Sequence, residues 1–577
     1  MSSLGLRNCL NVKNPSNMWR ALLRRSTFMF PKCIEAFSGA PFDSTRIMSF
    51  ERIYSLSQSP DLAPIEELFD QQDHLNPETP QDLWFQYWDS YDERLKKGGI
   101  RLWTLEEADQ TPRVFFQDTS GTQHNIKCPK TPFRVEDIPS QAFQKKILPL
   151  LEPRPLLPQL RIHRKRKTWI CRNSEGKKIL SVLMDEDLEL FRPSRFPGDV
   201  VIKKRTGYPH LRLHGVRGHG KDFEGLKELI EIRIGLMPLE TDIFTLSTQM
   251  LGLGEIEKKR KHPLQLHSRL YAPLAVGRVL SIEFQAMKQN LLGTLWGEDI
   301  EFLHDFRVSC RRSRSILAQL KSVFPKKTIQ PFLDDFAWLS RLTSPVRDLD
   351  VLLQKMQKPN TLNHFYTEVL DPILQWIKGR RDEEQTLLKD HLQSERFQVF
   401  AQSWEAFLDG QVPPLDSGED LPSIEPLVSK RIHRLWQRAL EEGRRIPDEE
   451  AHLAFHELRK TCKKLRYLLE AFRPLYSRND IQAPVKSLKR FQDLLGLMND
   501  TFVQKEFMQQ LSLTEELPEG SRLMAEKFAR NYDFQLAESA TRFQEVFAEF
   551  NDPARHSEWK HLLEQNPLVP ENLNLLE

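Results

Sequence analysis

The pattern of apolar and polar positions along this chain of 577 residues changes between about 255 and 265, and the change separates two regions. Between about residues 48 and 255, apolar and polar positions alternate in short stretches that Gly, Pro and Asp interrupt. Alternation with a period of two is typical of strands with one buried face. The stretches that predict strands are 83–88, 100–105, 114–117, 124–128, 168–172 and 178–184. Together they predict an antiparallel sheet or barrel.

From about residue 265 to residue 550 the apolar positions follow the 3.6-residue period of helices. In one stretch the polar face carries cations at steps of three, four and three residues, namely His304, Arg307, Arg311 and Arg314. The other side of the same helix carries Phe306, Cys310, Leu317 and Leu320. Like charges one turn apart repel each other, so an ordinary solvated face mixes acids with bases. A purely basic face indicates a binding surface, although for one helix alone a solvated face that happens to be basic is the commoner explanation.

The segment at 304–314 recurs at 456–466, at an offset of 152 residues and without a gap. The cations of the second copy are His456, Arg459, Lys463 and Arg466, and its apolar positions are Leu458, Cys462, Leu465, Leu469 and Phe472. The same offset carries Arg347 and Asp348 onto Asn499 and Asp500. A shared stretch of about fifty residues indicates a tandem duplication. Because both copies keep the basic face, the solvated-face explanation loses weight.

The His-x-x-Arg pattern with clustered Arg and Lys, followed about forty residues later by an Asp-containing element, resembles the CHAD domain, the conserved histidine α-helical domain. Segments that resemble this second element are present at 347–351 and again at 493–500. In that family a helical bundle of two repeats encloses a basic groove that binds inorganic polyphosphate, so the resemblance implies this fold and this ligand here. The implied polyphosphate-binding residues, with a basic helix face expected before the second histidine, are His304, Arg307, Arg311, Arg312, Arg314, His456, Arg459, Lys460, Lys463, Lys464, Arg466, Lys430, Arg434 and Arg438. Each histidine could add charge below about pH 6.5 or tie helices together through a hydrogen bond.

The segments 91–102 and 164–169, with Asp185, resemble the CYTH domain, which forms a tunnel of eight antiparallel strands. Enzymes of that family hydrolyse triphosphate with Mg²⁺ or Mn²⁺ held by inward carboxylates. Their first strand reads Glu-x-Glu-x-Lys, whereas this chain has Glu51, Ile53 and Ser55 at those positions. A late strand that normally supplies another acid pair reads Val-Val-Ile-Lys-Lys at 200–204. Glu51 and Asp185 are the main acids left, so the resemblance implies a degenerate and catalytically silent module.

No catalytic residue and no metal ligand is therefore assigned, and no cofactor is expected; Mg²⁺ or Mn²⁺ enters only if the CYTH-like module is active. The basic residues that remain in this module are Arg94, Arg101, Arg164 and Arg166. They could bind anions, or they could be ordinary surface cations.

Composition narrows the partners further. The net charge is only +3, so the local clustering of cations, and not their sum, indicates a polyanion. No run of 18 apolar residues is present, which predicts no membrane insertion. The six cysteines lie far apart and fit a reducing cytosol, with Cys310 and Cys462 as core residues. Trp338, Trp436 and Phe491 fall at apolar helix positions typical of core packing, so nucleic acid is disfavoured as a partner.

The predicted architecture is α+β and multidomain, with an antiparallel β-tunnel-like module followed by an all-α helical bundle of two repeats. Residues 1–47 are expected to be a disordered or spurious extension, 48–255 the degenerate CYTH-like domain, 265–550 the CHAD domain and 551–577 a tail. The repeats are expected at about 265–410 and 421–550. Basic residues at 258–263 mark the domain boundary, a Pro-rich acidic segment at 413–420 separates the repeats, and 565–577 is expected to lack structure.

The leading hypothesis is a non-catalytic, cytoplasmic protein that binds inorganic polyphosphate and associates with polyphosphate granules. The first alternative is a metal-dependent hydrolase of triphosphate or polyphosphate that uses the CYTH-like domain. The second alternative is a nucleic-acid-binding scaffold.

Overall fold

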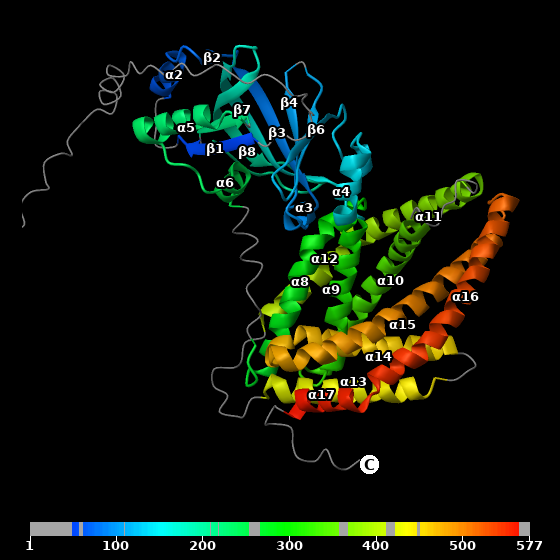
Figure 1. Cartoon of the computed structure of the whole chain (residues 1–577). Helices are drawn as coiled ribbons and strands as arrows, with labels where there is room; N and C mark the ends of the chain where they lie inside the picture. Colours follow the sequence, from blue (N-terminus) through cyan, green and yellow to red (C-terminus); the bar gives the residue numbers. More distant parts are fainter. Residues whose placement is uncertain are drawn as a thin grey trace, which may run out of the picture. The chain divides into compact units, whose positions relative to one another are not determined.

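The computed structural model describes residues 49–56, 62–108, 110–207, 209–216, 218–252, 266–356, 367–410, 422–446 and 451–564. They divide into two compact units, one within residues 1–261 and one within 262–577 (Figure 1). The predicted extension at 1–47, the boundary at 258–263, the segment at 413–420 and the end at 565–577 lie outside the described residues. Within the described part of the chain, no helix is both long enough and apolar enough to cross a membrane.

The N-terminal unit is built on one antiparallel sheet. Its strands are β1 (Ser49–Ser55), β2 (Asn76–Pro77), β3 (Gln81–Asp89), β4 (Arg101–Glu107), β5 (Arg113–Gln117), β6 (Gln123–Lys127), β7 (Leu157–Arg172), β8 (Lys178–Arg192), β9 (Ile202–Arg205) and β10 (His210–Val216). The order across the sheet is β1-β10-β8-β7-β3-β4-β5-β6, with β2 beside β7 and β9 beside β8. The antiparallel sheet predicted from the alternation is confirmed.

Two strands are much longer than their alternation predicts. Strand β7 begins eleven residues before the expected stretch, and β8 continues to Arg192. The missed segments contain many charged residues, which is unusual for strands in the middle of a sheet. These segments form strands because basic side chains of β7 lie opposite acidic side chains of β8. Arg166 is opposite Asp185 in the register, and Arg164 is opposite Asp187.

Helices cover both faces of this sheet. Helices α2 (Ala63–Asp70), α4 (Gln141–Leu151) and α5 (Gly220–Glu228) pack on the outer face, where Tyr54, Trp88 and Phe116 are buried. Helix α6 (Ile243–Met250) packs on the inner face, against Phe85 and Trp103. A short helix, α3 (Arg94–Lys97), leads into β4. The inner face is therefore covered by protein along part of its length.

The second unit is a bundle of long helices. They are α8 (Ala272–Trp296), α9 (Ile300–Gln319), α10 (Lys326–Met356), α11 (Thr367–Gln393), α12 (Glu395–Asp409), α13 (Ile424–Arg444), α14 (Ala451–Ala471), α15 (Arg478–Ser512), α16 (Glu519–Phe550) and α17 (Pro553–Glu564). Helices α9 and α14 carry the two copies of the repeated segment, and their apolar sides enter one shared core with Cys310 and Cys462 fully buried. The predicted core role of both cysteines is confirmed.

The bundle extends past residue 550, where the tail was expected to start. Helix α17 buries Trp559 completely, and its ring stacks on Trp436 with centroids 5.6 Å apart. Leu562 and Leu563 join the same core. The segment was missed because α17 is short and mixes charges with its apolar residues, so the expected start of the tail was wrong.

Candidate functional site

The basic faces of the two repeated helices meet inside the bundle. His304, Arg307 and Arg311 project from α9, and Arg459 and Lys463 project from α14. Arg311 lies close enough to both α14 side chains to depress their pKa values, and Arg307 also depresses that of Lys463. Arg347 of α10 acts in the same way on His304. These six side chains are called the central cationic cluster below.

Burial and mutual repulsion disfavour the charged forms of the side chains in this cluster. Burial, followed by Arg459, Arg311 and Arg307, lowers the pKa of Lys463 to about 7. Burial, followed by Arg347, lowers the pKa of His304 to about 4, so this histidine is neutral at physiological pH. Burial and Arg311 lower the pKa of Arg307 to about 10. An anion placed among these groups would relieve the repulsion.

The arginines of the cluster are anchored mainly by neutral groups. Arg307 donates to the hydroxyls of Thr343 and Ser344 at 2.8 and 3.1 Å, and Arg347 donates to the carbonyl of Ile300 at 3.2 Å. Neutral acceptors hold a guanidinium in place without cancelling its charge. Among the described residues Arg311 and Lys463 form no ion pair, and the Nε of Arg311 is buried without a partner.

Three carboxylates lie beside the cluster but do not balance it. Arg459 is 3.7 Å from Asp500, and Arg347 is 4.0 Å from Glu301 at the edge of the cluster. Burial raises the pKa of Asp348, and the neighbouring Asp500 raises it further. The two aspartates belong to the repeated second element of each half, so both copies of the whole pattern converge on one place.

Two of the predicted binding residues are already paired with carboxylates. Arg312 and Arg466 both pair with Glu470, at 2.7 and 2.6 Å, and Arg312 also reaches Glu283 at 3.5 Å. Glu470 follows Arg466 by four positions on α14, whereas Glu283 comes from α8. A pattern of cations within one helix cannot reveal an acid contributed by another helix.

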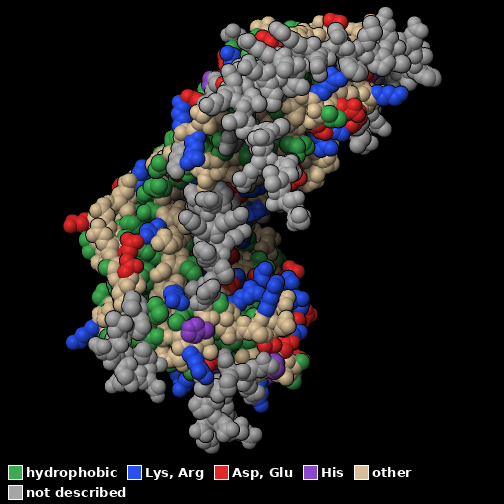
Figure 2. Space-filling view, turned by 90° about the vertical axis from the view of Figure 1, so that its left-hand side faces the viewer, with side chains coloured by type: hydrophobic (Ala, Val, Ile, Leu, Met, Phe, Trp, Pro, Cys, Tyr) green, Lys and Arg blue, Asp and Glu red, His purple; other side chains and the backbone are tan. Residues whose placement is uncertain are grey.

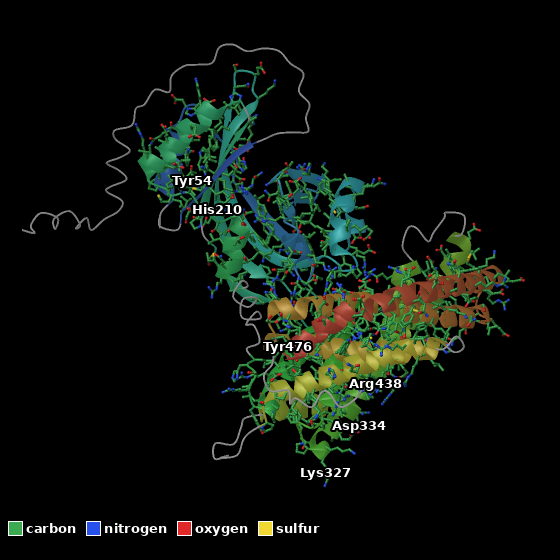
Figure 3. All side chains as sticks on the ribbon, turned by 60° about the horizontal axis from the view of Figure 1, so that its bottom comes forward. Tyr54, His210, Lys327, Asp334, Arg438 and Tyr476 are labelled. Carbon is green, nitrogen blue, oxygen red and sulfur yellow. The ribbon has the colours of Figure 1, made fainter. Side chains whose placement is uncertain are left out.

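The remaining predicted cations on α9, α13 and α14 are exposed, apart from the half-buried Lys464. Arg438, which Figure 3 labels, pairs with Glu442 at 2.6 Å, and Lys460 pairs with Glu457 at 2.6 Å. The cations with no ion pair to a described residue are Arg314, Lys430, Arg434 and Lys464. Figure 2 shows the same mixture more widely, with basic and acidic side chains interspersed over one face.

The two histidines are not equivalent. His456 is exposed, and its Nδ1 lies 3.0 Å from the amide oxygen of Asn499, whereas His304 is more deeply buried beside Arg347. The equivalent positions 347 and 499 thus hold an arginine in one repeat and an amide in the other. The second-element residues Arg347, Asp348, Asn499 and Asp500 were not among the predicted ligand contacts, although the repeat itself pointed to them.

On the inner face of the N-terminal sheet, the acids left for a metal are already engaged. Asp185 is fully buried and lies 2.6 Å from Arg166, 2.9 Å from Arg212, 3.5 Å from Arg164 and 3.3 Å from His210. Burial alone would raise its pKa, but Arg212, Arg166 and Arg164 hold the pKa well below its usual value. This carboxylate is neutralised by the protein itself.

Glu51 offers no second metal ligand next to Asp185. Its carboxylate lies 3.2 Å from the Nε2 of His214, and this contact together with Arg212 lowers its pKa against the opposing effect of burial. Within the described residues no three His, Cys, Asp or Glu side chains are placed to hold a metal ion. Mg²⁺ needs several free oxygen ligands, and the donors on this face do not fit it.

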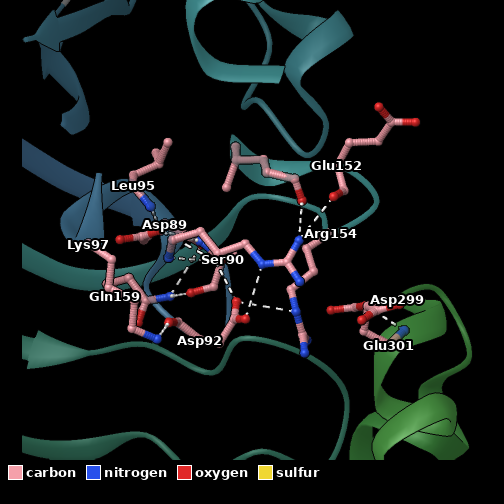
Figure 4. A network of polar contacts seen from close by, with 12 residues as sticks. Asp89, Ser90, Asp92, Leu95, Lys97, Glu152, Arg154, Gln159, Asp299 and Glu301 are labelled. Atoms are coloured by element: carbon pink, nitrogen blue, oxygen red, sulfur yellow. Dashed lines mark hydrogen bonds and ion pairs between the residues drawn. The ribbon is translucent and has the colours of Figure 1, made fainter. Parts of the chain in front are cut away.

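The four arginines expected on this module as anion binders or surface cations each pair with a carboxylate of the same unit. Arg164 and Arg166 are buried with Asp187 and Asp185, and Arg101 pairs with Asp242 at 2.7 Å beside α6. Arg94 pairs with Asp92 at 3.0 Å and donates to the carbonyls of Leu151 and Glu152. Figure 4 labels two of these partners, Asp92 and Glu152. All four arginines stabilise local structure.

Comparison with known proteins agrees with the helical assignment. Residues 278–509 match the family model described as the CHAD domain, so this part of the chain is a CHAD domain. An uncharacterised protein of Mycobacterium tuberculosis is 24% identical over 220 residues, which cover 37% of this chain and 40% of that relative. The chain therefore spans less than half the length of this curated relative.

Solved structures similar to each unit are also known. The CHAD domain from the plant Ricinus communis is 22% identical, with a TM-score of 0.43, over 49% of this chain and 93% of that chain. A structure from Hippeastrum, described as an adenylyl cyclase with a dominant triphosphatase activity, is 10% identical, with a TM-score of 0.25, over 36% of this chain and 96% of that chain.

Proposed function

We propose that this protein binds inorganic polyphosphate without hydrolysing it, through the central cationic cluster of its CHAD domain. The observation that carries the proposal is the convergence of both basic helix faces, with Arg311 and Lys463 lacking an acidic partner among the described residues. Such binding would bring the protein to polyphosphate granules in the cytoplasm.

Polyphosphate suits this cluster because it is a linear polymer with a high density of negative charge. Unlike a nucleic acid, it has no bases that the protein would need to recognise. A chain of phosphates lying between α9 and α14 would replace the repulsion among the cations with attraction, and it would release condensed counterions. Arginine offers planar, paired donors to phosphate oxygens, whereas Lys463 acts as a point charge. The affinity should therefore fall steeply with salt.

The decisive experiment combines Arg307→Ala with Arg459→Ala in the full chain and measures binding of long-chain polyphosphate on filters at two ionic strengths. These are equivalent residues of the two repeats, so both sides of the cluster are weakened. We expect the affinity to fall by at least about tenfold and the log–log salt slope to decrease by about two. Circular dichroism should remain helical because both side chains lie at the edge of the core.

The matched control combines Arg380→Ala with Arg530→Ala. Arg380 pairs with Glu383 on α11, and Arg530 pairs with Glu526 on α16. This control removes the same charge but spares the cluster, so the affinity should change by less than about threefold. An unchanged dissociation constant in the Arg307 and Arg459 variant would refute the assignment, and stronger competition by RNA than by polyphosphate at fixed salt would favour the nucleic-acid alternative.

The proposal also states that the N-terminal sheet is catalytically silent. Its support is the engagement of Asp185 by three arginines and of Glu51 by His214. Release of phosphate from triphosphate with Mg²⁺ or Mn²⁺ should stay at background. Robust turnover that Glu51→Ala abolishes would overturn this part of the proposal and leave the binding assignment untouched.

A further inference from the structure

A cleft of about 540 Å³ opens on the surface of the bundle where α14 ends and α15 begins. Its lining comes from α8, from the end of α14, from the short turn after it and from the start of α15, namely Val279, Ile282, Glu283, Glu470, Ala471, Arg473, Pro474, Tyr476 and Arg478. The volume lies within the range of about 300–1,000 Å³ that is typical of small-molecule sites. None of these residues belongs to the central cationic cluster, so the cleft is a separate feature.

Apolar side chains make up much of the lining. Val279 and Ile282 lie three positions apart on one face of α8, whereas Ala471 and Pro474 come from the end of α14 and the turn that follows. Ile282 is 48% exposed, so apolar surface remains in contact with water here. Covering this surface with an apolar group would be favourable through the hydrophobic effect.

Tyr476, which Figure 3 labels, presents its ring to the cleft while its hydroxyl is engaged by the protein. The hydroxyl lies 3.0 Å from that of Ser429, which in turn donates to the buried carboxylate of Glu425 at 3.0 Å. Because these hydrogen bonds hold the phenol oxygen, a ligand in the cleft would meet mainly the apolar part of this side chain.

The two acids of the lining are already neutralised by arginines. Arg312 lies 2.7 Å from Glu470 and 3.5 Å from Glu283. Arg466 pairs with Glu470 as well, at 2.6 Å. These carboxylates therefore have their counterions within the protein and do not require a cationic ligand.

Arg473 and Arg478 supply the charge that is left over in the cleft. Both side chains line it, both are exposed, and neither forms an ion pair with a described residue. Guanidinium groups bind carboxylates and phosphates through paired, charge-assisted hydrogen bonds. Two such groups beside an apolar lining complement a molecule that is apolar along most of its length and negatively charged at one end.

We propose that this cleft binds a small amphiphilic anion, in which a single carboxylate or phosphate group ends an apolar chain. The apolar chain contacts Ile282, Pro474 and the ring of Tyr476, and the anionic group is held by Arg473 and Arg478. Inorganic polyphosphate does not match this site, because it has no apolar part. The proposal therefore stands or falls independently of the polyphosphate assignment.

The experiment titrates the full chain by calorimetry with octanoate, octyl phosphate and 1-octanol, each below the concentration at which it aggregates. We expect at least one of the two anions to bind saturably, with one molecule per chain, and the tighter anion identifies the preferred head group. Octanol should bind at least about tenfold more weakly, because it cannot form charge-assisted hydrogen bonds with the arginines.

Three variants locate the site. Arg473→Gln combined with Arg478→Gln should weaken binding of the anion at least about tenfold and leave that of octanol unchanged. Ile282→Gln should weaken binding of both. Arg380→Gln with Arg530→Gln is the control, because it removes the same charge from exposed ion pairs on α11 and α16 and should change the affinity less than about threefold. These five side chains are exposed, so circular dichroism should remain native.

Several outcomes would overturn the proposal. They are saturable binding of neither anion, equal affinities for octanoate and octanol, no effect of the Arg473 and Arg478 variant, and displacement of the bound anion by long-chain polyphosphate. A dimer in sedimentation experiments that Ile282→Gln dissociates would also overturn it, because a second copy of the chain would then cover the cleft.

Discussion

At the residue scale, glycines decide how closely some helices of the bundle approach each other. A Cβ atom on Gly443 of α13 would lie 2.1 Å from the ring of Phe547, and one on Gly293 of α8 would lie 2.2 Å from the ring of Phe302. Both rings belong to buried side chains that cannot move away easily. The helices meet there because the side chain is absent.

Gly443→Ala is therefore expected to destabilise the bundle by about 1–3 kcal/mol, because the added methyl overpacks the core. The control is Gly496→Ala on α15, where no atom lies within 4 Å of the added Cβ. This change should be neutral or stabilising by up to about 1 kcal/mol, because Ala has the higher helix propensity. Urea unfolding followed by circular dichroism checks both, and equal effects of the two changes would contradict the prediction.

Lys463 gives a second residue-scale prediction, in which stability depends on pH. Its pKa is about 7 in the folded protein and about 10.5 in the unfolded chain, so the unfolded chain binds the extra proton between these values. The free energy of unfolding should thus rise with pH across this window, and the cost of the buried charge is complete below about pH 7.

Lys463→Met should accordingly stabilise the free protein, by about 1–2 kcal/mol at pH 6 and by much less at pH 10. The same variant should bind polyphosphate more weakly. Urea midpoints at the two pH values measure the first effect, with Lys430→Met as the exposed control that should show no pH-dependent gain. A gain that does not change with pH would show that the charge of Lys463 is not the cause.

At the element scale, the two units arrange their charged side chains in opposite ways. On the sheet, β7, β8 and β10 bring arginines against Asp185 and Asp187, so their charges cancel within the protein. In the bundle, α9 and α14 bring cations against cations, and the carboxylates beside them, Glu301, Asp348 and Asp500, do not balance their charge. Cancelled charges stabilise a fold, whereas uncancelled charges of one sign need an external partner.

Asp185→Asn tests whether the cancelled charges on the sheet stabilise the N-terminal unit. Removing this carboxylate leaves Arg166 and Arg212 without their main counterion, and breaking such a buried pair costs about 3–5 kcal/mol. We expect the N-terminal unit to melt at a clearly lower temperature by calorimetry. Asp82→Asn is the control. Asp82 is largely exposed, and its one ion pair among the described residues is a long contact of 3.7 Å to His163, so this change should alter stability by less than about 0.5 kcal/mol.

Acid should reproduce the effect of Asp185→Asn. The pKa of Asp185 is far below its unfolded value, so its contribution to stability is complete above about pH 4 and is lost as the pH falls toward the folded pKa. The variant should therefore lose less stability than the wild type between pH 5 and pH 3. Parallel losses in both proteins would contradict the assigned role of Asp185.

At the scale of the whole molecule, the net charge of +3 reveals neither the paired charges of the sheet nor the unbalanced cations of the bundle, since basic and acidic side chains are nearly equal in number. The extent of each unit is likewise set by packing that composition does not reveal. The bundle closes only when α17 adds Trp559 to the core against Trp436.

Trp559→Ala is expected to destabilise the bundle by about 3–5 kcal/mol, because it empties a large and completely buried site. A chain that ends at residue 550 should lose at least as much. The control is Phe534→Ala on α16, whose side chain is 77% exposed. Thermal unfolding followed by circular dichroism gives the comparison, and a native melting temperature for the shortened chain would show that α17 is dispensable.

Four features can be predicted from the sequence alone: the duplication, the amphipathic faces of α9 and α14, the core role of Cys310 and Cys462, and the antiparallel character of the N-terminal unit. These features follow from the period of apolar positions within a segment, and that period is a local property. Which cations are paired with an acidic side chain cannot be read from this local period, because it depends on the tertiary structure. Glu470 and Glu283 neutralise Arg312, three arginines enclose Asp185, and Arg311 faces Lys463, because electrostatic interactions depend on distances between side chains that lie far apart in the sequence.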